Sequence, residues 1–347
     1  CTTNQDVKFD ADIDKKTKAL KGSARTEQAR SFVTKIWNAS RFLLMNMDGY
    51  TPGEPVAETA ADAWMFSRLA KAAQLVTEGI EHYTFGEMAR GVQNFFWNEV
   101  CDWYVEVTKT RLKDDAARLQ AQRNLMFVLD ASLRLMHPLM PFVTEAIWDQ
   151  MPASWLDVNE DGSIERAEAL MIAFWPEPAD LARFIDEPAE RTFELARALV
   201  SDVRSTRARY RISPKQELRC EVKASTAEVA EDIIGMADFI RGLANVSELV
   251  VLTADEFVKP EKAIALAGPD FDAYVVMGDL VDFDAERARM EKELKAAEKE
   301  LAGAERMLGN EGFVAKAAPE VVAKKRERAA ELVETIAAIK AQLEDFA

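Results

Sequence analysis

Apolar residues recur every three or four positions through most of the chain, which is the spacing of amphipathic helices. In the first half this spacing predicts helices over residues 23–47, 59–82, 85–110, 114–136 and 141–150. Turn residues such as Asp48-Gly49 and Pro52-Gly53 separate the first two of them. Long amphipathic helices joined by short turns predict an antiparallel helical bundle.

The stretch Leu125–Trp148 is expected to form the centre of this bundle. Its helical spacing should end near Met136, because His137 precedes a proline, which disfavours the helical conformation at His137. Pro141 then suits the first turn of a short helix, from which Phe142 and Trp148 can face back into the core. His137 is expected to bond to backbone at this corner, because no partner constellation for catalysis accompanies it.

The run FFWNEVCDWY at residues 95–104 is dense in aromatic side chains. Such residues can stack on the bases of a single-stranded nucleic acid. They can equally fill a helical core, and we favour the core because their spacing is helical and no basic residues interleave with them.

The pattern changes after the bundle. Residues 151–186 are rich in prolines and turn residues and predict a segment that wraps over the bundle or links it onward. A helix is expected from Pro188 to Arg204. Short β-rich runs follow, with a helix capped by Ser225-Thr226 among them; they read QELRCEV, SELVVL, AIALA and AYVVMG. This mixture predicts a small α+β unit.

Two heptad seams form the last part of the chain. The first comprises Met290, Leu294, Ala297, Leu301, Ala304 and Leu308. The second comprises Ala329, Leu332, Ile336, Ile339, Leu343 and Phe346. Glycines and a proline separate the seams, which predicts an antiparallel coiled-coil hairpin whose first helix is capped by Asp284.

The predicted fold class is therefore mainly α, with an antiparallel helical bundle, a small α+β unit and a coiled-coil hairpin. The expected divisions are residues 1–22 as an extended connection, 23–186 as the bundle with its wrapping segment, 187–283 as the α+β unit and 284–347 as the hairpin.

Composition narrows the class of protein without identifying it. Of the 347 residues, 48% are hydrophobic and 30% are charged, as in globular proteins with charged surface helices. No apolar run of about 18 residues is present, so no transmembrane helix is expected. The start lacks both a signal peptide and an initiator Met, so the chain is expected to be an excised part of a longer protein. Three scattered cysteines fit a reducing, cytoplasmic compartment.

The net charge of −16 argues against indiscriminate binding of polyanions, although a local basic stripe remains compatible with it. Motifs of known chemistry are absent from the sequence: it contains no GxxxxGK, GxGxxG, HExxH or GxSxG. Only two histidines are available for a catalytic site. The chain alone is therefore expected to have no enzymatic activity.

Four strings resemble one family, the valyl-tRNA synthetases of class I. KIWNASRF at 35–42, FFWNEVCDWYVEVTK at 95–109 and LMHPLMPFVTEAIW at 135–148 are similar to the family's anticodon-binding bundle. NEGFVAKAAPEVVAKKRERAAEL at 310–332 is similar to its C-terminal coiled-coil arm. The resemblance covers nearly the whole chain. The sequence departs from the family in lacking the HIGH and KMSKS signatures of the ATP site and the editing domain.

The resemblance implies a tRNA-recognition part of a valine–tRNA ligase, with tRNA-Val as partner. The parent enzyme would use ATP with Mg and valine, and would carry catalytic and editing domains that precede this part. The fragment itself would need no cofactor or metal, would not contact membranes, and would be a cytoplasmic monomer. The competing hypothesis is a coiled-coil scaffold that binds proteins rather than tRNA.

Three sets of residues are candidates for tRNA contact. Hydrogen-bonding groups on the first helix could read unstacked anticodon bases, or could instead anchor the bundle to a catalytic domain: Arg30, Lys35, Asn38 and Arg41. The densest basic run could bind phosphates, or could be a solvated helix end: Arg204, Arg207, Arg209 and Arg211, followed by Lys215 and Arg219. On the arm, the resemblance implies contact with the outer corner of tRNA, whereas charge alone allows a solvated coiled-coil surface: Lys316, Lys324, Lys325 and Arg328.

Overall fold

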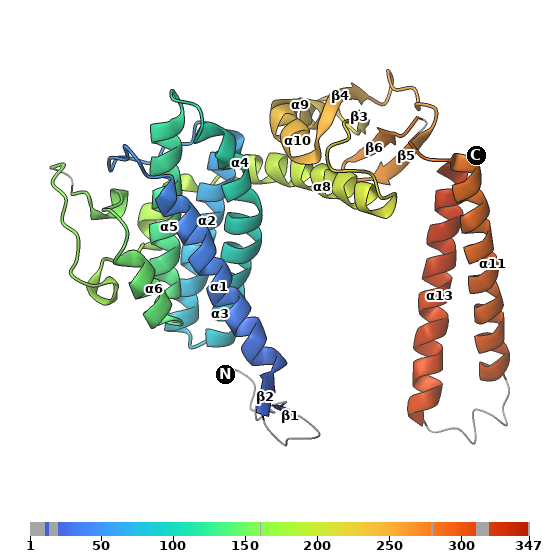
Figure 1. Cartoon of the computed structure of the whole chain (residues 1–347), viewed down its shortest axis with the longest axis horizontal. Coiled ribbons are helices and arrows are strands. Elements are labelled where there is room, and N and C mark those ends of the chain that lie inside the picture. The colour runs from blue at the N-terminus through green and yellow to red at the C-terminus, as the bar shows by residue number, and fades with distance from the viewer. Residues whose placement is uncertain (1–10, 14–19, 160, 279, 310–318, 346–347) are drawn as a thin grey trace. The chain divides into compact units, whose positions relative to one another are not determined.

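A computed structural model describes residues 11–13, 20–159, 161–278, 280–309 and 319–345 (Figure 1). Contacts within the chain divide it into two units, Cys1–Glu194 and Leu195–Ala347, which are described separately.

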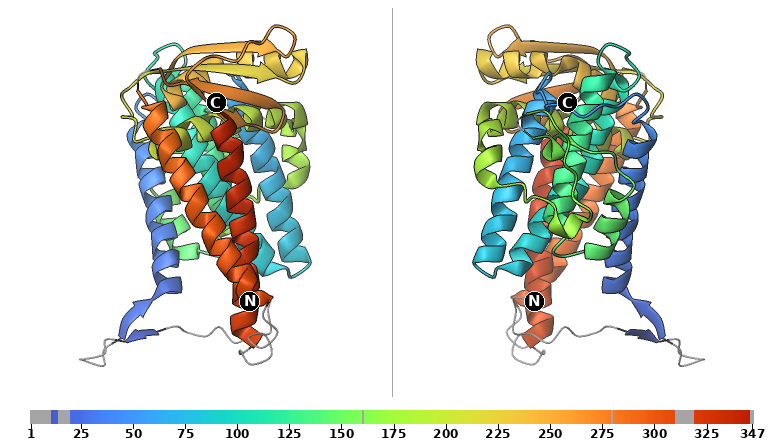
Figure 2. Two further views of the ribbon diagram at one scale, coloured as in Figure 1. Left: turned by 90° about the vertical axis from the view of Figure 1, so that its right-hand side faces the viewer. Right: turned by 90° about the vertical axis from the view of Figure 1, so that its left-hand side faces the viewer.

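The first unit is a helical bundle preceded by an antiparallel pair of short strands, β1 (Ala11–Ile13) and β2 (Leu20–Ser23). Its helices are α1 (Ala24–Met45), α2 (Ala60–Glu81), α3 (Phe85–Asn94), the π-helical segment η1 (Phe95–Tyr104), α4 (Val105–Arg111), α5 (Arg118–Met136) and α6 (Pro141–Trp148). Helix α2 packs against α3 and α5, while α1 packs against η1 and α6 (Figures 1 and 2). The predicted bundle is confirmed.

Helix α5 lies at the centre of the bundle, since every side chain from Asn124 to Met136 is buried. It ends at Met136, and Pro141 occupies the first turn of α6, as predicted. Trp148 faces the core, but the prediction for Phe142 is wrong, because this side chain is 91% exposed. The two are six positions apart, which at 100° per residue places their side chains about 120° apart around the short helix, so Phe142 leaves the buried face.

A buried ionic cluster joins α5 to the segment that follows α6. The Arg134 guanidinium donates to both carboxylate oxygens of Asp130, at 3.0 and 2.9 Å, and to Asp157 at 2.6 Å. Trp148 donates its Nε1–H to Asp130 at 2.9 Å. His137 bonds through Nδ1 to the Thr144 hydroxyl at 2.8 Å, so its predicted partner, the backbone, is wrong.

The predicted third helix is continuous, but its middle, η1, has π-helical geometry. Bonds from i to i+5 add a residue to each turn and shift which side chains face inward. Phe95, Phe96 and Tyr104 are buried, so the core interpretation of the aromatic run is confirmed for them. Trp97 is only half-buried, and it stacks on Phe32 of α1 with ring centroids 5.8 Å apart.

In its described residues the wrapping segment forms short turns of helix, η2 (Trp155–Asp157), η3 (Leu170–Ile172), α7 (Pro178–Leu181) and η4 (Ala182–Phe184), and one isolated antiparallel bridge between Val158 and Ile164. Helix α8 (Glu187–Arg209) follows, and its first turn is fixed to α2 through Glu190, which accepts from Lys71 at 2.8 Å and from the Ser67 hydroxyl.

The second unit contains the four-stranded sheet and the hairpin. The sheet comprises β3 (Leu218–Ala224), β4 (Val246–Thr253), β5 (Ala263–Ala267) and β6 (Phe271–Val276) in the order β4-β3-β6-β5. Strands β3 and β4 are parallel, so the chain crosses over between them through α9 (Ala227–Gly235) and α10 (Ala237–Ala244). Thr226 caps α9 by accepting from the backbone N–H of Val229 at 3.2 Å, as predicted.

The hairpin consists of α11 (Phe283–Leu308) and α13 (Pro319–Asp345), which lie side by side (Figures 1 and 2). Ala297, Leu332 and Ile336 form its buried seam, which confirms the heptad interpretation, and Phe346 lies outside the described residues. The helix cap is Asp282, which accepts from the Ala285 N–H at 2.9 Å, rather than the predicted Asp284. The prediction placed the start of the helix too late in the chain.

Candidate nucleic-acid interface

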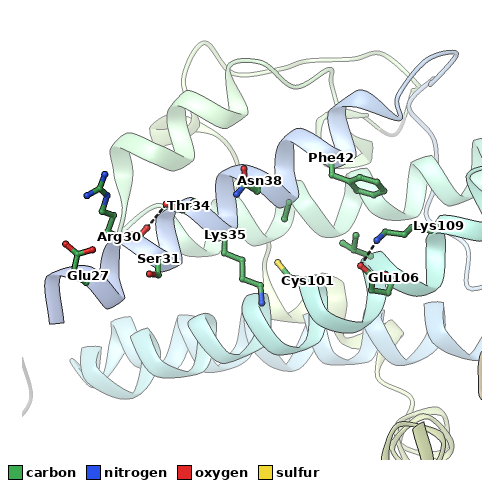
Figure 3. Close-up of a pocket in the computed structure, with 12 residues that line it drawn as sticks. Glu27, Arg30, Ser31, Thr34, Lys35, Asn38, Phe42, Cys101, Glu106 and Lys109 are labelled. Atoms are coloured by element: carbon green, nitrogen blue, oxygen red, sulfur yellow. Dashed lines mark hydrogen bonds and ion pairs between the residues drawn. The ribbon is translucent and has the colours of Figure 1, made fainter. Parts of the chain in front are cut away.

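An open groove runs between α1 and the wall formed by η1 and α4 (Figure 3). Its volume is ≈ 630 Å³, enough for a small ligand or an unstacked base. It is lined by Glu27, Arg30, Ser31, Thr34, Lys35, Asn38, Ala39 and Phe42 from α1 and by Cys101, Val105, Glu106 and Lys109 opposite. Three of the four residues predicted to contact an anticodon therefore share one groove.

Lys35 is the most constrained cation of the groove. Its Nζ lies 2.6 Å from an Asp102 carboxylate oxygen and 4.1 Å from the centre of the Trp97 ring. In Figure 3 its side chain crosses from α1 towards the opposite wall. An ion pair and a cation–π contact together fix the direction in which the ammonium can donate.

Asn38, Phe42 and Lys109 supply groups suited to a base. The Asn38 amide offers donors and an acceptor, and Phe42 offers an aromatic face half-buried in the groove. Lys109 Nζ lies 5.4 Å from the centre of the Phe42 ring and 2.5 Å from Glu106. Because acidic groups accompany the lysines, the groove favours hydrogen bonding and stacking over simple attraction of phosphates.

The Cys101 thiol lines the same groove but is unsuited to nucleophilic chemistry. Burial raises its pKa to about 12, although the positive charge of Lys35 acts in the opposite direction. The group is therefore a neutral thiol near pH 7, and the reactive species of cysteine is the thiolate.

The other two predicted α1 residues differ in position. Arg30 lies at one end of the groove, where Thr34 donates to its backbone carbonyl at 2.9 Å. Arg41 lines a separate hollow of ≈ 230 Å³ with Trp37 and Ile147. The structure thus does not bring Arg41 together with the other three residues.

The basic run of the second unit divides by burial. Arg207 is buried and donates to the carbonyls of Ala244, Asn245 and Gln216 at 3.0, 2.6 and 2.6 Å. These bonds tie α8 to the end of α10 and to the approach to β3, so we assign Arg207 a structural role and remove it from the candidate contacts. Arg204 is exposed and donates to the Leu243 carbonyl at 2.9 Å.

Arg209, Arg211, Lys215 and Arg219 are all exposed. Arg209 and Arg211 line a second pocket. Arg219 is paired on the sheet with Glu221 at 2.9 Å.

On the arm, Lys324 is exposed and Lys325 is half-buried. Arg328 is an interhelical clasp, because its guanidinium donates to Glu300 of α11 at 3.0 and 3.4 Å and to Glu331 at 3.1 Å. Its charge is therefore partly compensated within the hairpin. Lys316 lies outside the described residues.

Other classes of site find no support in the described part of the chain. Among those residues no three histidine, cysteine or acidic side chains are grouped so that they could hold a metal ion. No helix in the same ranges is long and apolar enough to cross a membrane.

The sequence did not single out Phe42 or Lys109 as groove residues. Both lie within the family-like strings, but helical spacing alone does not tell which partly exposed face of one helix will oppose another. The π-helical geometry of η1 makes the groove residues still harder to predict, because it changes which side chains of residues 95–104 point towards α1.

Comparison with known proteins finds a matching family for two ranges of the chain. Residues 62–224 match the family described as the anticodon-binding domain of tRNA ligase. Residues 282–347 match the family described as the valyl tRNA synthetase tRNA binding arm.

Curated relatives agree with these domain matches. The valine–tRNA ligase of Symbiobacterium thermophilum is 36% identical over 331 residues, which is 92% of this chain and 36% of that protein. The enzyme of the same name from Thermotoga maritima is 34% identical over 91% of this chain and 34% of its own length. That of Rhodopirellula baltica is 35% identical over 93% and 31%.

The chain thus spans about a third of the length of these relatives. The two domain matches occur in the order in which the bundle and the coiled-coil hairpin occur here. The chain belongs to the valine–tRNA ligase family, as the part that carries its anticodon-binding domain and its tRNA binding arm.

Proposed function

We propose that this chain is the part of a valine–tRNA ligase that recognises tRNA-Val. The bundle, residues 23–186, would bind the anticodon loop, and the arm, residues 284–347, would bind the outer corner of the tRNA. The α+β unit, residues 187–283, would add contacts to phosphates. Residues 1–22 would connect the bundle to the preceding domains.

The groove on α1 carries this proposal. It combines a fixed cation, Lys35, an amide, Asn38, and an aromatic face, Phe42, within ≈ 630 Å³. Single-stranded RNA loops are read by such groups, because unstacked bases expose both hydrogen-bonding edges and flat faces. The scaffold hypothesis rests on the heptads of the hairpin and assigns no role to this groove.

Aminoacylation belongs to the whole enzyme in this proposal. ATP with Mg and valine would bind the part of the relatives that lies outside this chain, because the HIGH and KMSKS signatures are missing from the sequence. Editing is needed because an apolar pocket rejects a hydroxyl-bearing isostere of valine only weakly. In this proposal it would reside in that same part of the relatives. We propose a cytoplasmic, monomeric protein whose macromolecular partner is tRNA-Val.

Arg30, Lys35 and Asn38 are the proposed anticodon contacts, with Phe42 added by the geometry of the groove. Arg41 is retained as a contact of the flanking nucleotides, since it lies outside the groove. Arg204, Arg209 and Arg211 are the proposed phosphate contacts of the α+β unit. Lys316, Lys324 and Lys325 are those of the arm, and Arg328 contributes mainly by clasping its two helices.

The test is binding of the chain to a tRNA-Val transcript across a salt series, beside the same transcript with a changed anticodon. We expect tighter binding to the valine anticodon and an affinity that falls linearly on a logarithmic salt scale. Equal affinity for both transcripts would reject anticodon reading while leaving phosphate contacts. Absence of RNA binding, together with dimerisation through the heptads, would favour the scaffold hypothesis.

A further inference from the structure

A cationic pocket lies within the second unit and shares no lining residue with the groove on α1. It has a volume of ≈ 520 Å³ and is lined by the end of α8 and the start of α11. Arg209, Tyr210 and Arg211 form one side, and Asp282, Ala285 and Arg289 form the other. Three arginines thus line one hollow in a chain whose net charge is −16.

We propose that this pocket binds a phosphate group of the tRNA backbone. The proposal rests on the function proposed above and deepens it, because it assigns one anionic group of the ligand to one place on the second unit. It also brings in Arg289, which the basic run of the sequence does not include.

The backbone at Arg211 supports a role for its side chain. Its φ is +54°, a left-handed conformation that glycine adopts with less strain than any side-chain-bearing residue. The conformation ends α8, since the N–H of Ile212 bonds back to the Arg207 carbonyl at 2.9 Å. Ending the helix does not require an arginine. The turn therefore does not explain why this position carries a positively charged side chain.

Among the described residues that line the pocket, arginines outnumber carboxylates three to one. Asp282 is the carboxylate among these described residues, and it accepts a hydrogen bond from the Ala285 N–H at 2.9 Å. Arg289 pairs with Glu293 at 2.8 Å, but both side chains are about half exposed, so solvent weakens that compensation. The N-terminus of α11 adds the positive end of a helix dipole.

The arrangement favours a phosphodiester of RNA over an isolated phosphate ion. Arg209 lies over the Tyr210 ring, with its guanidinium carbon 5.5 Å from the ring centre. A flat guanidinium beside a ring can contact a sugar or base next to a bound phosphate. Guanidinium groups also match phosphate oxygens in a bidentate manner, which fixes the position of the backbone.

The main variant is Arg211→Gly in the full chain, with Arg289→Gln as a second variant. Arg241→Gln is the matched control, since it removes the same charge from an exposed, ion-paired arginine of the second unit that lies outside the basic run. The readouts are the affinity for the tRNA-Val transcript across a salt series and the midpoint of thermal unfolding.

We expect Arg211→Gly to raise the unfolding midpoint, because glycine relieves the left-handed strain, and yet to weaken tRNA binding about fivefold. A purely structural arginine would not separate the two effects in this way. Arg289→Gln should weaken binding similarly, and each variant should reduce the salt slope by about one. Discrimination between anticodons should stay unchanged in both.

If both variants bind tRNA with the same affinity as the Arg241→Gln control, the phosphate pocket is overturned while the proposed function stays intact. Failure of the unsubstituted chain to bind tRNA would overturn both. Inorganic phosphate at millimolar concentration distinguishes the two sources of the anion. Competition with tRNA that is lost in Arg211→Gly would show that the tRNA backbone and the free anion share this pocket. Phosphate that binds in an Arg211-dependent manner without displacing tRNA would indicate a site for free phosphate and would overturn the assignment to the RNA backbone.

Discussion

At the scale of single residues, Lys35 is held by two neighbours that differ in what they do. Asp102 pairs with its ammonium at 2.6 Å and so reduces its net attraction for any anion. Trp97 holds the same ammonium over its ring at 4.1 Å. We infer that this arrangement lowers the affinity for RNA of any sequence and fixes the direction in which the Lys35 ammonium donates. Fixed charges act in this way at specific interfaces.

Asp102→Asn should therefore strengthen binding to RNA of any sequence and weaken discrimination between anticodons. Removal of the carboxylate leaves the lysine free to turn towards phosphates, and we expect discrimination to fall about fivefold, on the order of 1 kcal/mol. Binding to the two transcripts measures both effects. Asp115→Asn is the control, because it removes an equal charge from an exposed turn. Unchanged discrimination would show that the ion pair does not orient Lys35.

Arg134 illustrates a residue whose role is structural. It bonds to Asp130 and Asp157, and all three side chains are almost fully buried. Arg134→Met should cost about 3–5 kcal/mol of unfolding free energy, because it strands two buried carboxylates. Chemical denaturation of the full chain measures the loss. The exposed Arg90→Met on α3 should stay within about 0.5 kcal/mol, and a similar cost for both would contradict the assignment.

At the scale of elements, the sequence predicted what local chemistry determines. The predicted break between two helices appears between Met136, where α5 ends, and Pro141, where α6 begins, and the heptad seams pack as a hairpin. The orientation of residues that depends on tertiary contacts was harder to predict from the sequence. Phe142 lies on the outer face of a short helix, and an apolar residue there fits the pattern of a buried one equally well. The π-helical geometry of η1 has no signal in apolar spacing that we can identify.

The first turn of α8 is anchored to α2 by an acidic residue whose ionisation affects stability. Burial alone would raise the pKa of Glu190, but hydrogen bonds from Lys71 and Ser67 and the charge of Arg68 outweigh it and hold the pKa below its ordinary value of 4.5. A carboxylate with a lowered pKa stabilises the folded state above its unfolded pKa, and this stabilisation is lost as the pH falls through the folded pKa.

The free energy of unfolding should therefore exceed that of Glu190→Gln at pH 6, and the difference should shrink as the pH falls below 4.5. Denaturation of both proteins at several pH values measures it. A difference that stayed constant down to pH 3 would mean that the ionised form of Glu190 contributes nothing to the anchor.

On the arm, different residues are proposed to bind tRNA and to hold the two helices together. Lys324→Glu with Lys325→Glu should weaken tRNA binding by about tenfold and flatten its salt slope, because two proposed phosphate contacts become repulsive. Arg328→Glu should instead loosen the hairpin, because it faces Glu300. Adding Glu300→Arg should restore the helical content measured by circular dichroism. Unchanged affinity in the lysine variant would remove this face of the arm from the interface.

At the scale of the whole molecule, the family resemblance carried more of the function than physical patterns did. The bundle, the α+β unit and the hairpin follow from spacing and turn chemistry. Among the predicted contacts, Arg30, Lys35 and Asn38 line one groove, because at 100° per residue they lie within an arc of about 140° on α1. Arg207 could not be distinguished from its neighbours, since its burial depends on carbonyls of α10 that lie far away in sequence.

The central claim is that the groove on α1 reads the anticodon, and Asn38→Ala tests it most directly. The affinities of this variant and of the unsubstituted chain are measured for the valine-anticodon transcript and for the changed one. We predict that the substitution abolishes most of the discrimination between the transcripts, whereas the arm variant Lys324→Glu with Lys325→Glu lowers both affinities by the same factor. Discrimination that survives Asn38→Ala but falls in the arm variant would contradict the account.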